Sequence, residues 1–394
     1  MKESLFNYRF EYENQKYIFN TNNNGLIQIN NDIFTEEERE YLRVNRFWVD
    51  DNEDEIALLE REINHNIQKR QKELELTIAL TNYCNFSCVY CYQNKNEKLM
   101  TTEVANMIIE KIDRILNDNI FEGINIHYFG GEPLLNIPVL IYLDENIKKI
   151  TDKIGIVYKA FLTTNGSMLS KELLQKVKFS SIQLTFDGLE KTHDRLRVSD
   201  HFHFKEEIEL IENIMNFSQA KVLLRTNICK ENKDEIIALH KYIFEKFGNE
   251  RIEINPNRTI KYHQDDSFEM LSVQEYAEVA YQIKLLWSEQ KGKFELPVPR
   301  STPCKFPYGN AYAISPEGYC TFCSGSMDQE KKYFFDVDIV NKKMFSVRKE
   351  CKKCNILPLC LGGCIIQYNL RAGACTYEKY ELKNILISYI KHIS

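Results

Sequence analysis

Six apolar, β-branched runs alternate with segments of helical periodicity between about residues 74 and 290. The runs lie at 74–80, 123–129, 155–163, 181–186, 221–227 and 251–255, and the helical segments at 103–118, 136–150, 168–177, 204–217, 232–246 and 273–289. Six successive strand–helix units predict an α/β fold with a parallel sheet. In barrels built from such units, chemistry collects where the strands end and the loops into the helices begin.

The chain on either side of these units has other patterns. Three short alternating runs in YRFEYENQKYIFNTNNNGLIQIN predict a β-meander, and Thr35 with Glu38 predicts a helix that begins with a capping box. After a proline-bearing linker, ELPVPRSTPCKFP, the chain is short-looped and rich in cysteine. We therefore predict three domains, at 1–70, 74–297 and 298–394.

Composition and charge limit the possible functions. The net charge is −6 and the Lys and Arg residues are scattered, so the chain lacks the electrostatic footprint of a nucleic-acid-binding protein. The sequence starts without signal-peptide features, and no apolar run approaches the roughly 18 residues that cross a bilayer. We expect a cytoplasmic protein with no nucleic-acid and no membrane partner. Twelve cysteines are then unusual, because a reducing compartment disfavours disulfides and favours metal binding or catalysis.

Three of these cysteines crowd into the loop after the first predicted strand. Cys84, Cys88 and Cys91 span eight positions in LTNYCNFSCVYCYQN. This spacing lets three thiolates converge on one iron–sulfur cube, and three ligands on a four-iron cluster leave one iron open to a substrate or cofactor. The alternative is a zinc site completed by a distant histidine, although zinc sites favour paired CxxC units. Cys229 stands alone, and we assign it no role.

The C-x3-C-x2-C pattern, with Tyr90 before its last cysteine, resembles the signature of the radical S-adenosylmethionine (radical SAM) enzymes, whose fold is a partial (β/α)6 barrel. Three further motifs follow the next three strands and are similar to motifs of that family: FGGEP at 129–133, TTNG at 163–166 and TFDGLEKTHDRLR at 185–197. Thr185 stands where the family usually has Ser. The resemblance implies a SAM-binding 4Fe–4S cluster on the three cysteines. It also implies SAM contacts from Tyr90, Gly130, Gly131, Glu132, Asn165, Thr185 and Arg197.

The resemblance, which covers about residues 74 to 290, also implies a reaction. One electron from the cluster would cleave SAM to methionine and a 5'-deoxyadenosyl radical, which abstracts hydrogen from an unactivated carbon. An external ferredoxin or flavodoxin would supply the electron. The sequence assigns no catalytic acid or base.

Eight more cysteines lie in the last hundred residues. Their spacing is similar to that of the SPASM domain, which follows the barrel in many radical SAM enzymes and holds two auxiliary 4Fe–4S clusters. The resemblance implies a first auxiliary cluster on Cys304, Cys323 and Cys364, and a second on Cys351, Cys354, Cys360 and Cys375. Cys320 departs from the seven-cysteine pattern; it either completes the first cluster or has no metal role. The alternative for this region is a zinc-ribbon-like fold, since two closely spaced cysteine pairs supply four plausible zinc ligands.

The SPASM resemblance points to a substrate class. It implies a maturase of ribosomally made peptides that forms a thioether or another crosslink, or inverts an α-carbon. The stretch YRFEYENQKYIFNTNNNGLIQINND resembles the opening of maturases that form thioethers in cysteine-rich peptides, and either peptide recognition by residues 1–70 or simple capping of the barrel fits that segment. Anaerobic sulfatase maturases are an alternative, but they carry Asp immediately after the cysteine at the position of Cys323, where this chain has Ser324. An iron–sulfur or zinc-binding module without catalysis is a further alternative, and it predicts no SAM affinity.

Overall fold

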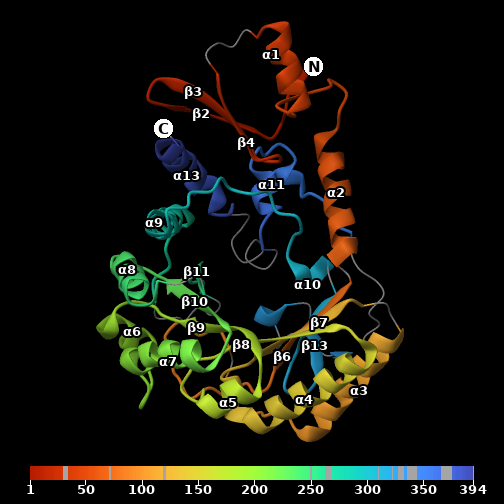
Figure 1. Cartoon of the computed structure of the whole chain (residues 1–394), viewed down its shortest axis with the longest axis vertical. Helices are drawn as coiled ribbons and strands as arrows, with labels where there is room; N and C mark the ends of the chain where they lie inside the picture. The colour runs from red at the N-terminus through yellow and green to blue at the C-terminus, as the bar shows by residue number, and fades with distance from the viewer. Residues whose placement is uncertain are drawn as a thin grey trace. The chain divides into compact units, whose positions relative to one another are not determined.

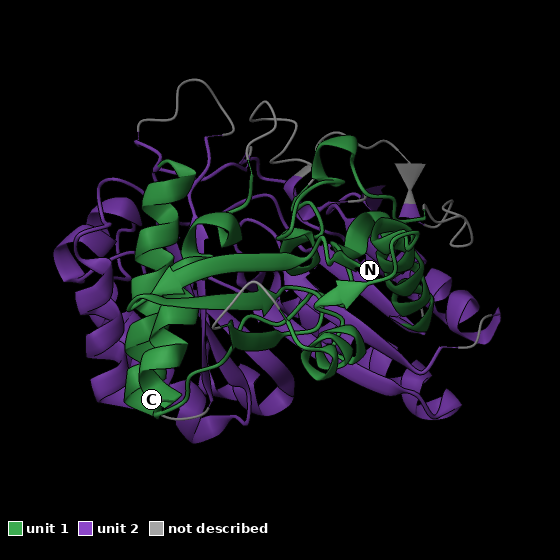
Figure 2. Cartoon of the chain, turned by 90° about the horizontal axis from the view of Figure 1, so that it is seen from above, with its two compact units in different colours: residues 1–69, 272–308, 343–394 green, residues 70–271, 309–342 purple. Residues whose placement is uncertain are grey.

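The computed structural model describes residues 1–29, 34–70, 72–93, 95–118, 121–248, 251–261, 268–308, 310–321, 323–326, 332–334, 344–364 and 375–393. The chain forms two compact units (Figure 2). Unit 1 comprises residues 1–69, 272–308 and 343–394, and unit 2 comprises residues 70–271 and 309–342. Each unit is assembled from separate stretches of the chain, and the division into three consecutive domains stays a prediction.

Unit 2 is built on a sheet in which six neighbouring strands, counted from one edge, follow one another in sequence order (Figure 1). They are parallel to their neighbours throughout. These strands are β6 (Glu73–Ala79), β7 (Gly123–Phe129), β8 (Val157–Thr163), β9 (Phe179–Thr185), β10 (Lys221–Ile228) and β11 (Ile252–Arg258). Beyond β6 the sheet continues with a parallel strand and two antiparallel ones: β12 (Ala311–Ile314), β13 (Tyr319–Thr321) and β14 (Lys332–Tyr333). All six predicted strands are present, with ends shifted by at most three residues.

Helices follow the strands of unit 2 and lie along the outer side of the sheet (Figure 1). They are α3 (Thr102–Asp118), η1 (Pro133–Asn136), α4 (Ile137–Ile154), α5 (Lys171–Lys176), α6 (Glu190–Leu196), α7 (Phe204–Phe217) and α8 (Ile236–Phe247). Of these, the short η1 and α6 were not predicted. Repeated strand–helix units with a parallel sheet confirm the predicted α/β fold of the partial-barrel type.

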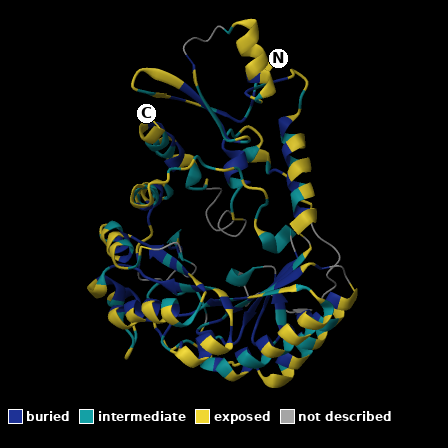
Figure 3. Cartoon of the chain, viewed as in Figure 1, coloured by how far each residue is buried: buried dark blue, intermediate teal, exposed yellow. Residues whose placement is uncertain are grey.

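The two faces of the unit 2 sheet differ in character. In β7, Ile124, Ile126 and Tyr128 are fully buried, whereas Asn125 and His127 on the opposite face are half-buried. Because side chains alternate along a strand, the buried face is the one covered by helices and the other is the inner face of the barrel. Asn125 and His127 of β7 therefore lie on the inner face. Exposed residues are concentrated on the surrounding helices, and the strands are mostly buried (Figure 3).

Unit 1 joins the two ends of the chain. Its N-terminal part contains β1 (Lys2–Glu3), the meander β2 (Asn7–Tyr12), β3 (Gln15–Asn20) and β4 (Gly25–Ile29), then α1 (Glu36–Val44), β5 (Trp48–Val49) and α2 (Glu55–Arg70). Its remaining elements are α9 (Val273–Lys291), α10 (Lys305–Tyr308), η4 (Lys349–Cys351), α11 (Leu357–Cys360) and α13 (Glu378–Ile393). The meander is confirmed, and Thr35 and Glu38 form the predicted capping box at the start of α1.

An apolar stripe explains why the N-terminal segment shares a unit with the cysteine-rich segment. Leu59, Ile63 and Ile67 recur every four residues along α2 and are buried. They share a core with Phe345 and Leu357 of the C-terminal segment. Burial of this stripe contributes on the order of 1.5–3 kcal/mol per side chain.

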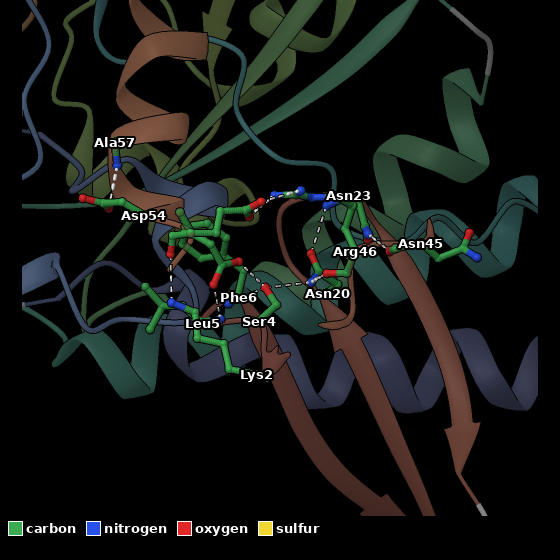
Figure 4. A network of polar contacts seen from close by, with 12 residues as sticks. Lys2, Ser4, Leu5, Phe6, Asn20, Asn23, Asn45, Arg46, Asp54 and Ala57 are labelled. Carbon is green, nitrogen blue, oxygen red and sulfur yellow. Dashed lines mark hydrogen bonds and ion pairs between the residues drawn. The ribbon is translucent and has the colours of Figure 1, made fainter. Parts of the chain in front are cut away.

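Polar contacts fasten the start of the chain to the loops around it (Figure 4). The carboxylate of Glu55 accepts hydrogen bonds from Ser4 Oγ at 2.5 Å and from the amide of Leu5 at 2.8 Å. Asn20 Nδ2 donates to Ser4 Oγ at 3.3 Å and to the carbonyl of Arg46 at 3.1 Å. These bonds hold the meander against the first turn of α2. Among the described residues, no helix is both long and apolar enough to cross a bilayer.

Candidate functional site

The three clustered cysteines lie on the loop that follows β6. The amide of Cys91 donates to the carbonyl of Cys88 at 3.2 Å, which marks a tight turn. The loop is also hydrogen-bonded to the chain after α6, because the Ser87 amide donates to the Val198 carbonyl at 2.8 Å and the Val89 amide donates to the Leu196 carbonyl at 3.0 Å. None of the three cysteines forms a disulfide. The loop thus presents three thiols from a backbone fastened to a neighbouring segment.

The surroundings of these thiols favour a cationic group. Burial raises the pKa of Cys84, and it raises that of Cys88 to about 12, while the nearby Arg197 guanidinium acts in the opposite direction on Cys88. Bare thiolates are therefore unfavourable here, and a bound metal centre would supply the positive charge that stabilises them. The described residues contain no group of three His, Cys, Asp or Glu side chains placed to hold one metal ion. Three thiols on one loop fit a four-iron cluster, in which each cysteine binds a different iron.

Two glycines bring the FGGEP loop against the cysteine loop. The amide of Gly131 donates to the Thr81 carbonyl at 2.8 Å, and the amide of Glu132 donates to the Tyr83 carbonyl at 2.9 Å. Gly130 has φ +145°, and a Cβ placed on it would lie 2.4 Å from the Thr81 carbonyl oxygen. Only glycine permits this close approach of the two backbones.

The Glu132 side chain points into the protein. It is fully buried and accepts hydrogen bonds from the amide of Leu134 at 3.0 Å, the hydroxyl of Thr164 at 2.6 Å and the amide of Asn165 at 2.6 Å. Burial raises the pKa of Glu132 to about 7, and the three donors oppose that rise. The carboxylate therefore joins the FGGEP loop to the TTNG loop, and protein donors occupy it.

The motif at the end of β9, residues 185–197, also contacts the cysteine loop. The Tyr90 hydroxyl donates to Asp187 Oδ2, and the amide of Asn227 donates to Asp187 Oδ1 at 2.6 Å. Arg197 is buried and lies over the Phe86 ring, with its guanidinium carbon 5.4 Å from the ring centroid.

Arg197 offers a group that a ligand can use. Its Nε has no hydrogen-bond partner among the described residues. An unpartnered buried donor beside Cys88 is what the carboxylate of a bound ligand would satisfy. Thr185, at the end of β9, is also buried.

The structure thus brings together the predicted site residues of four loops, those that follow β6, β7, β8 and β9, at the carboxyl ends of these strands. Sequence reasoning missed Asn85, Ser167 and Asn227, which hydrogen-bond to Asn165 or Asp187. Asn85 and Ser167 directly follow predicted motif residues, and this adjacency was the available signal. Asn227 is the last residue of a predicted strand and belongs to no motif, so no sequence signal marked it as a site residue.

The eight C-terminal cysteines divide between the units. Cys351, Cys354, Cys360 and Cys375 all belong to unit 1, and Cys354 acts electrostatically on both Cys351 and Cys360, while Cys375 acts on Cys351. This is the set expected to hold the second auxiliary cluster. Of the set expected for the first, Cys304 and Cys364 belong to unit 1, and Cys323, with Cys320, belongs to unit 2. Both ligand sets stay predictions.

Sequence comparison matches residues 78–243 to the family model of the radical SAM superfamily. The chain is 34% identical over 119 residues to an uncharacterized protein of Methanocaldococcus jannaschii, a match that covers 29% of this chain and 39% of that protein. It is 23% identical over 372 residues to the radical SAM cyclopropyl synthase TigE of Paramaledivibacter caminithermalis, which covers 83% of this chain and 76% of TigE. It is also 31% identical over 186 residues to a GTP 3',8-cyclase of Helicobacter pylori, covering 45% of this chain and 53% of the cyclase. The chain thus spans less than two thirds of two of these relatives.

Two solved structures share the fold. One is native anSMEcpe with bound AdoMet and the Cp18Cys peptide, with a TM-score of 0.64 at 18% identity over 82% of this chain and 100% of that chain. The other is Streptococcus suis SuiB bound to the precursor peptide SuiA, with a TM-score of 0.56 at 16% identity over 96% of this chain and 98% of that chain. With the motif loops assembled at the strand ends and residues 78–243 matching the family model, this part of the chain is a radical SAM domain.

Proposed function

We propose that this protein is a radical SAM maturase that modifies a ribosomally made peptide by forming a thioether or another side-chain crosslink. The observation that carries this proposal is the joining of the cysteine loop to the three other motif loops. Tyr83 accepts from Glu132 of the FGGEP loop, Asn85 accepts from Asn165 of the TTNG loop, and Tyr90 donates to Asp187 of the fourth loop. A binding module without catalysis has no need for this assembly.

The residues present fit the cofactors that the family implies. Cys84, Cys88 and Cys91 would hold a 4Fe–4S cluster, and Arg197 would bind the carboxylate of SAM. When bound and reduced by one electron from a ferredoxin or flavodoxin, these cofactors supply chemistry that breaks unactivated C–H bonds. The protein contributes position: Asp187 fixes the Tyr90 side chain, and the glycines of the FGGEP loop keep its backbone against the cysteine loop.

Polar side chains on the inner face of the sheet support a peptide substrate. They form hydrogen-bonded pairs: His127 Nε2 lies 2.7 Å from Thr163 Oγ1, Asn255 Nδ2 donates to Gln183 Oε1 at 3.3 Å, and Arg225 Nε donates to Asn227 Oδ1 at 2.8 Å. Amide and guanidinium groups of this kind can exchange hydrogen bonds with a peptide backbone. These side chains line the interior of the barrel.

The relatives give the peptide proposal further support. TigE is similar along 83% of this chain, and SuiB, whose structure contains a precursor peptide, shares the fold along 96% of it. A coverage of 96% takes in most of the N-terminal segment, for which we propose a role in peptide recognition. The C-terminal cysteines would hold two auxiliary 4Fe–4S clusters.

The test is anaerobic reconstitution followed by counts of iron and sulfide per chain and an assay for 5'-deoxyadenosine after addition of dithionite and SAM. We expect about twelve irons, and a loss of about four with loss of deoxyadenosine when Cys84, Cys88 and Cys91 are all replaced by Ala. Zinc in place of iron, or no deoxyadenosine from fully loaded protein, would show a metal-binding module. Mass spectrometry of a peptide encoded beside the gene then detects the loss of two hydrogens that a crosslink produces. Because formylglycine made from serine loses the same two hydrogens, a hydrazide reagent, which reacts only with the aldehyde of formylglycine, separates the two products.

A further inference from the structure

Hydrogen bonding distinguishes Cys84 from the other two cysteines of the triplet. Its sulfur accepts from the backbone amide of Phe86 at 3.4 Å and from the side-chain amide of Asn165, whose Nδ2 lies 3.8 Å away. Within the described residues, the sulfurs of Cys88 and Cys91 accept no hydrogen bond. The second donor to Cys84 comes from the loop after β8, 81 residues further along the chain.

The orientation of the Asn165 amide is set by a closed ring of three hydrogen bonds. Asn165 Nδ2 donates to Asn85 Oδ1 at 2.8 Å, Asn85 Nδ2 donates to Ser167 Oγ at 2.9 Å, and Ser167 Oγ donates to Asn165 Oδ1 at 2.7 Å. The Ser167 amide also donates to Asn165 Oδ1 at 3.0 Å. Reversing the Asn165 amide would place its NH2 group against the Ser167 amide, which only donates, and its oxygen against Asn85 Oδ1, so its NH2 group must face Asn85 and Cys84.

The backbone of Asn165 is fixed as well. Its amide donates to the buried Glu132 carboxylate at 2.6 Å, and the side chain is only 7% exposed. The donor is therefore held in place before any ligand binds. Little conformational entropy remains to be lost when it hydrogen-bonds a thiolate.

We propose that Asn165 is a positioning residue that donates an N–H···S hydrogen bond to the Cys84 thiolate and raises the reduction potential of the cluster it ligates. Reduction adds negative charge to the cluster, and a donor to a ligand sulfur stabilises that charge. This inference rests on the proposed function, because it requires a cluster on the triplet. It gives Asn165 a role toward the cluster in place of the SAM contact expected from its motif.

The experiment compares Asn165→Ala with wild type and with Asn146→Ala as a matched control. Asn146 lies on α4 and its side chain donates to the Tyr142 carbonyl within that helix, so its loss leaves the cysteine loop untouched. Reconstituted proteins are counted for iron, then poised anaerobically at the wild-type midpoint potential. The reduced cluster is measured by electron paramagnetic resonance, and the SAM-sensitive part of the signal identifies the triplet cluster. SAM affinity is measured separately on oxidised protein.

We expect Asn165→Ala to keep the wild-type iron content and SAM affinity while its ratio of reduced to oxidised cluster falls at least threefold. A threefold change corresponds to about 28 mV for one electron. Asn165→Asp should lower the ratio further, since it replaces the donor with a negative charge, and Asn146→Ala should match wild type.

Three results would overturn the inference. An unchanged ratio at full iron content would remove the effect on potential, and a tenfold loss of SAM affinity at an unchanged ratio would make Asn165 a SAM contact. Loss of about four irons from Asn165→Ala would make it necessary for assembly of the cluster. If wild-type protein assembles no cluster on the triplet, the proposed function fails with it; a normal wild-type cluster with an unchanged ratio in the variant refutes only this inference.

Discussion

Gly131 and Tyr83 meet so closely that a Cβ placed on Gly131 would lie 2.2 Å from the Tyr83 carbonyl oxygen. We predict that Gly131→Ala separates the FGGEP loop from the cysteine loop, because that oxygen also accepts the amide of Glu132. Iron on the triplet should fall by about four per chain and deoxyadenosine formation should be lost. The matched control is Gly155→Ala, since nothing lies within 4 Å of a Cβ there. That change should cost only about 1–2 kcal/mol for its left-handed backbone and leave iron content unchanged. Wild-type iron content in Gly131→Ala would mean that the two loops need not touch.

We predict that the buried Glu132 carboxylate stabilises the fold of the protein even when no SAM is bound. In Glu132→Ala, three buried donors, Leu134 N, Thr164 Oγ1 and Asn165 N, lose their acceptor. At about 1 kcal/mol or more for each, we expect metal-free protein to lose about 3 kcal/mol in urea unfolding. Glu132→Gln keeps one acceptor oxygen and should lose less. If stability were unchanged while SAM affinity fell, the carboxylate would contact SAM directly.

Local patterns were sufficient to predict the six strands and most helices of unit 2, because buried parallel strands such as β10 read as continuous apolar, β-branched runs. The helix α6 escaped prediction, since its seven residues, EKTHDRL, are mostly polar and too few to show a period. The association of the two chain ends also escaped it. The stripe on α2 that includes Ile63 is visible in the sequence, but its partner Phe345 lies in a distant segment, and no local signal connects them.

For the site, too, the sequence was sufficient to predict the local motifs but not the contacts between distant loops. Motif residues such as Cys84 and Glu132 were found by spacing and resemblance, but the direction of the Glu132 side chain depends on donors supplied by another loop. The contact of Cys84 with Asn165 likewise depends on the register of β6, β7 and β8, which places the ends of three strands side by side. Sequence identified which loops matter, and only the folded sheet establishes which atoms meet.

Stability of unit 2 should fall with acid because of His240. This side chain is fully buried on α8, with Nε2 3.2 Å from Thr226 Oγ1, and burial lowers its pKa from 6.5 to about 3. Below pH 6.5 the unfolded chain takes up a proton there that the native state does not, so the free energy of unfolding falls as pH falls toward 3. The loss is about 1.4 kcal/mol per pH unit, or about 2 kcal/mol between pH 6.5 and 5.

Urea unfolding of metal-free protein at pH 7 and pH 5 checks this prediction. His240→Gln should reduce the difference in unfolding free energy between the two pH values by about 2 kcal/mol. Replacing the exposed His201 by Gln serves as the control and should retain the wild-type difference. An equal pH dependence in wild type and His240→Gln would place the source of the acid sensitivity elsewhere.

Cys354 provides a test of the second auxiliary cluster that does not disturb the triplet. It lies in unit 1 and acts electrostatically on Cys351 and Cys360, whereas the triplet lies in unit 2. We expect Cys354→Ala to lose about four irons per chain and still form deoxyadenosine from SAM without peptide, because SAM cleavage depends on the triplet. Modification of the peptide should be lost. Cys229→Ala, which removes a fully buried cysteine beside Asn232, should keep all its iron. If Cys354→Ala also keeps all its iron, Cys354 is not a ligand; if it loses about one zinc instead, the C-terminal segment is a zinc-ribbon-like structure.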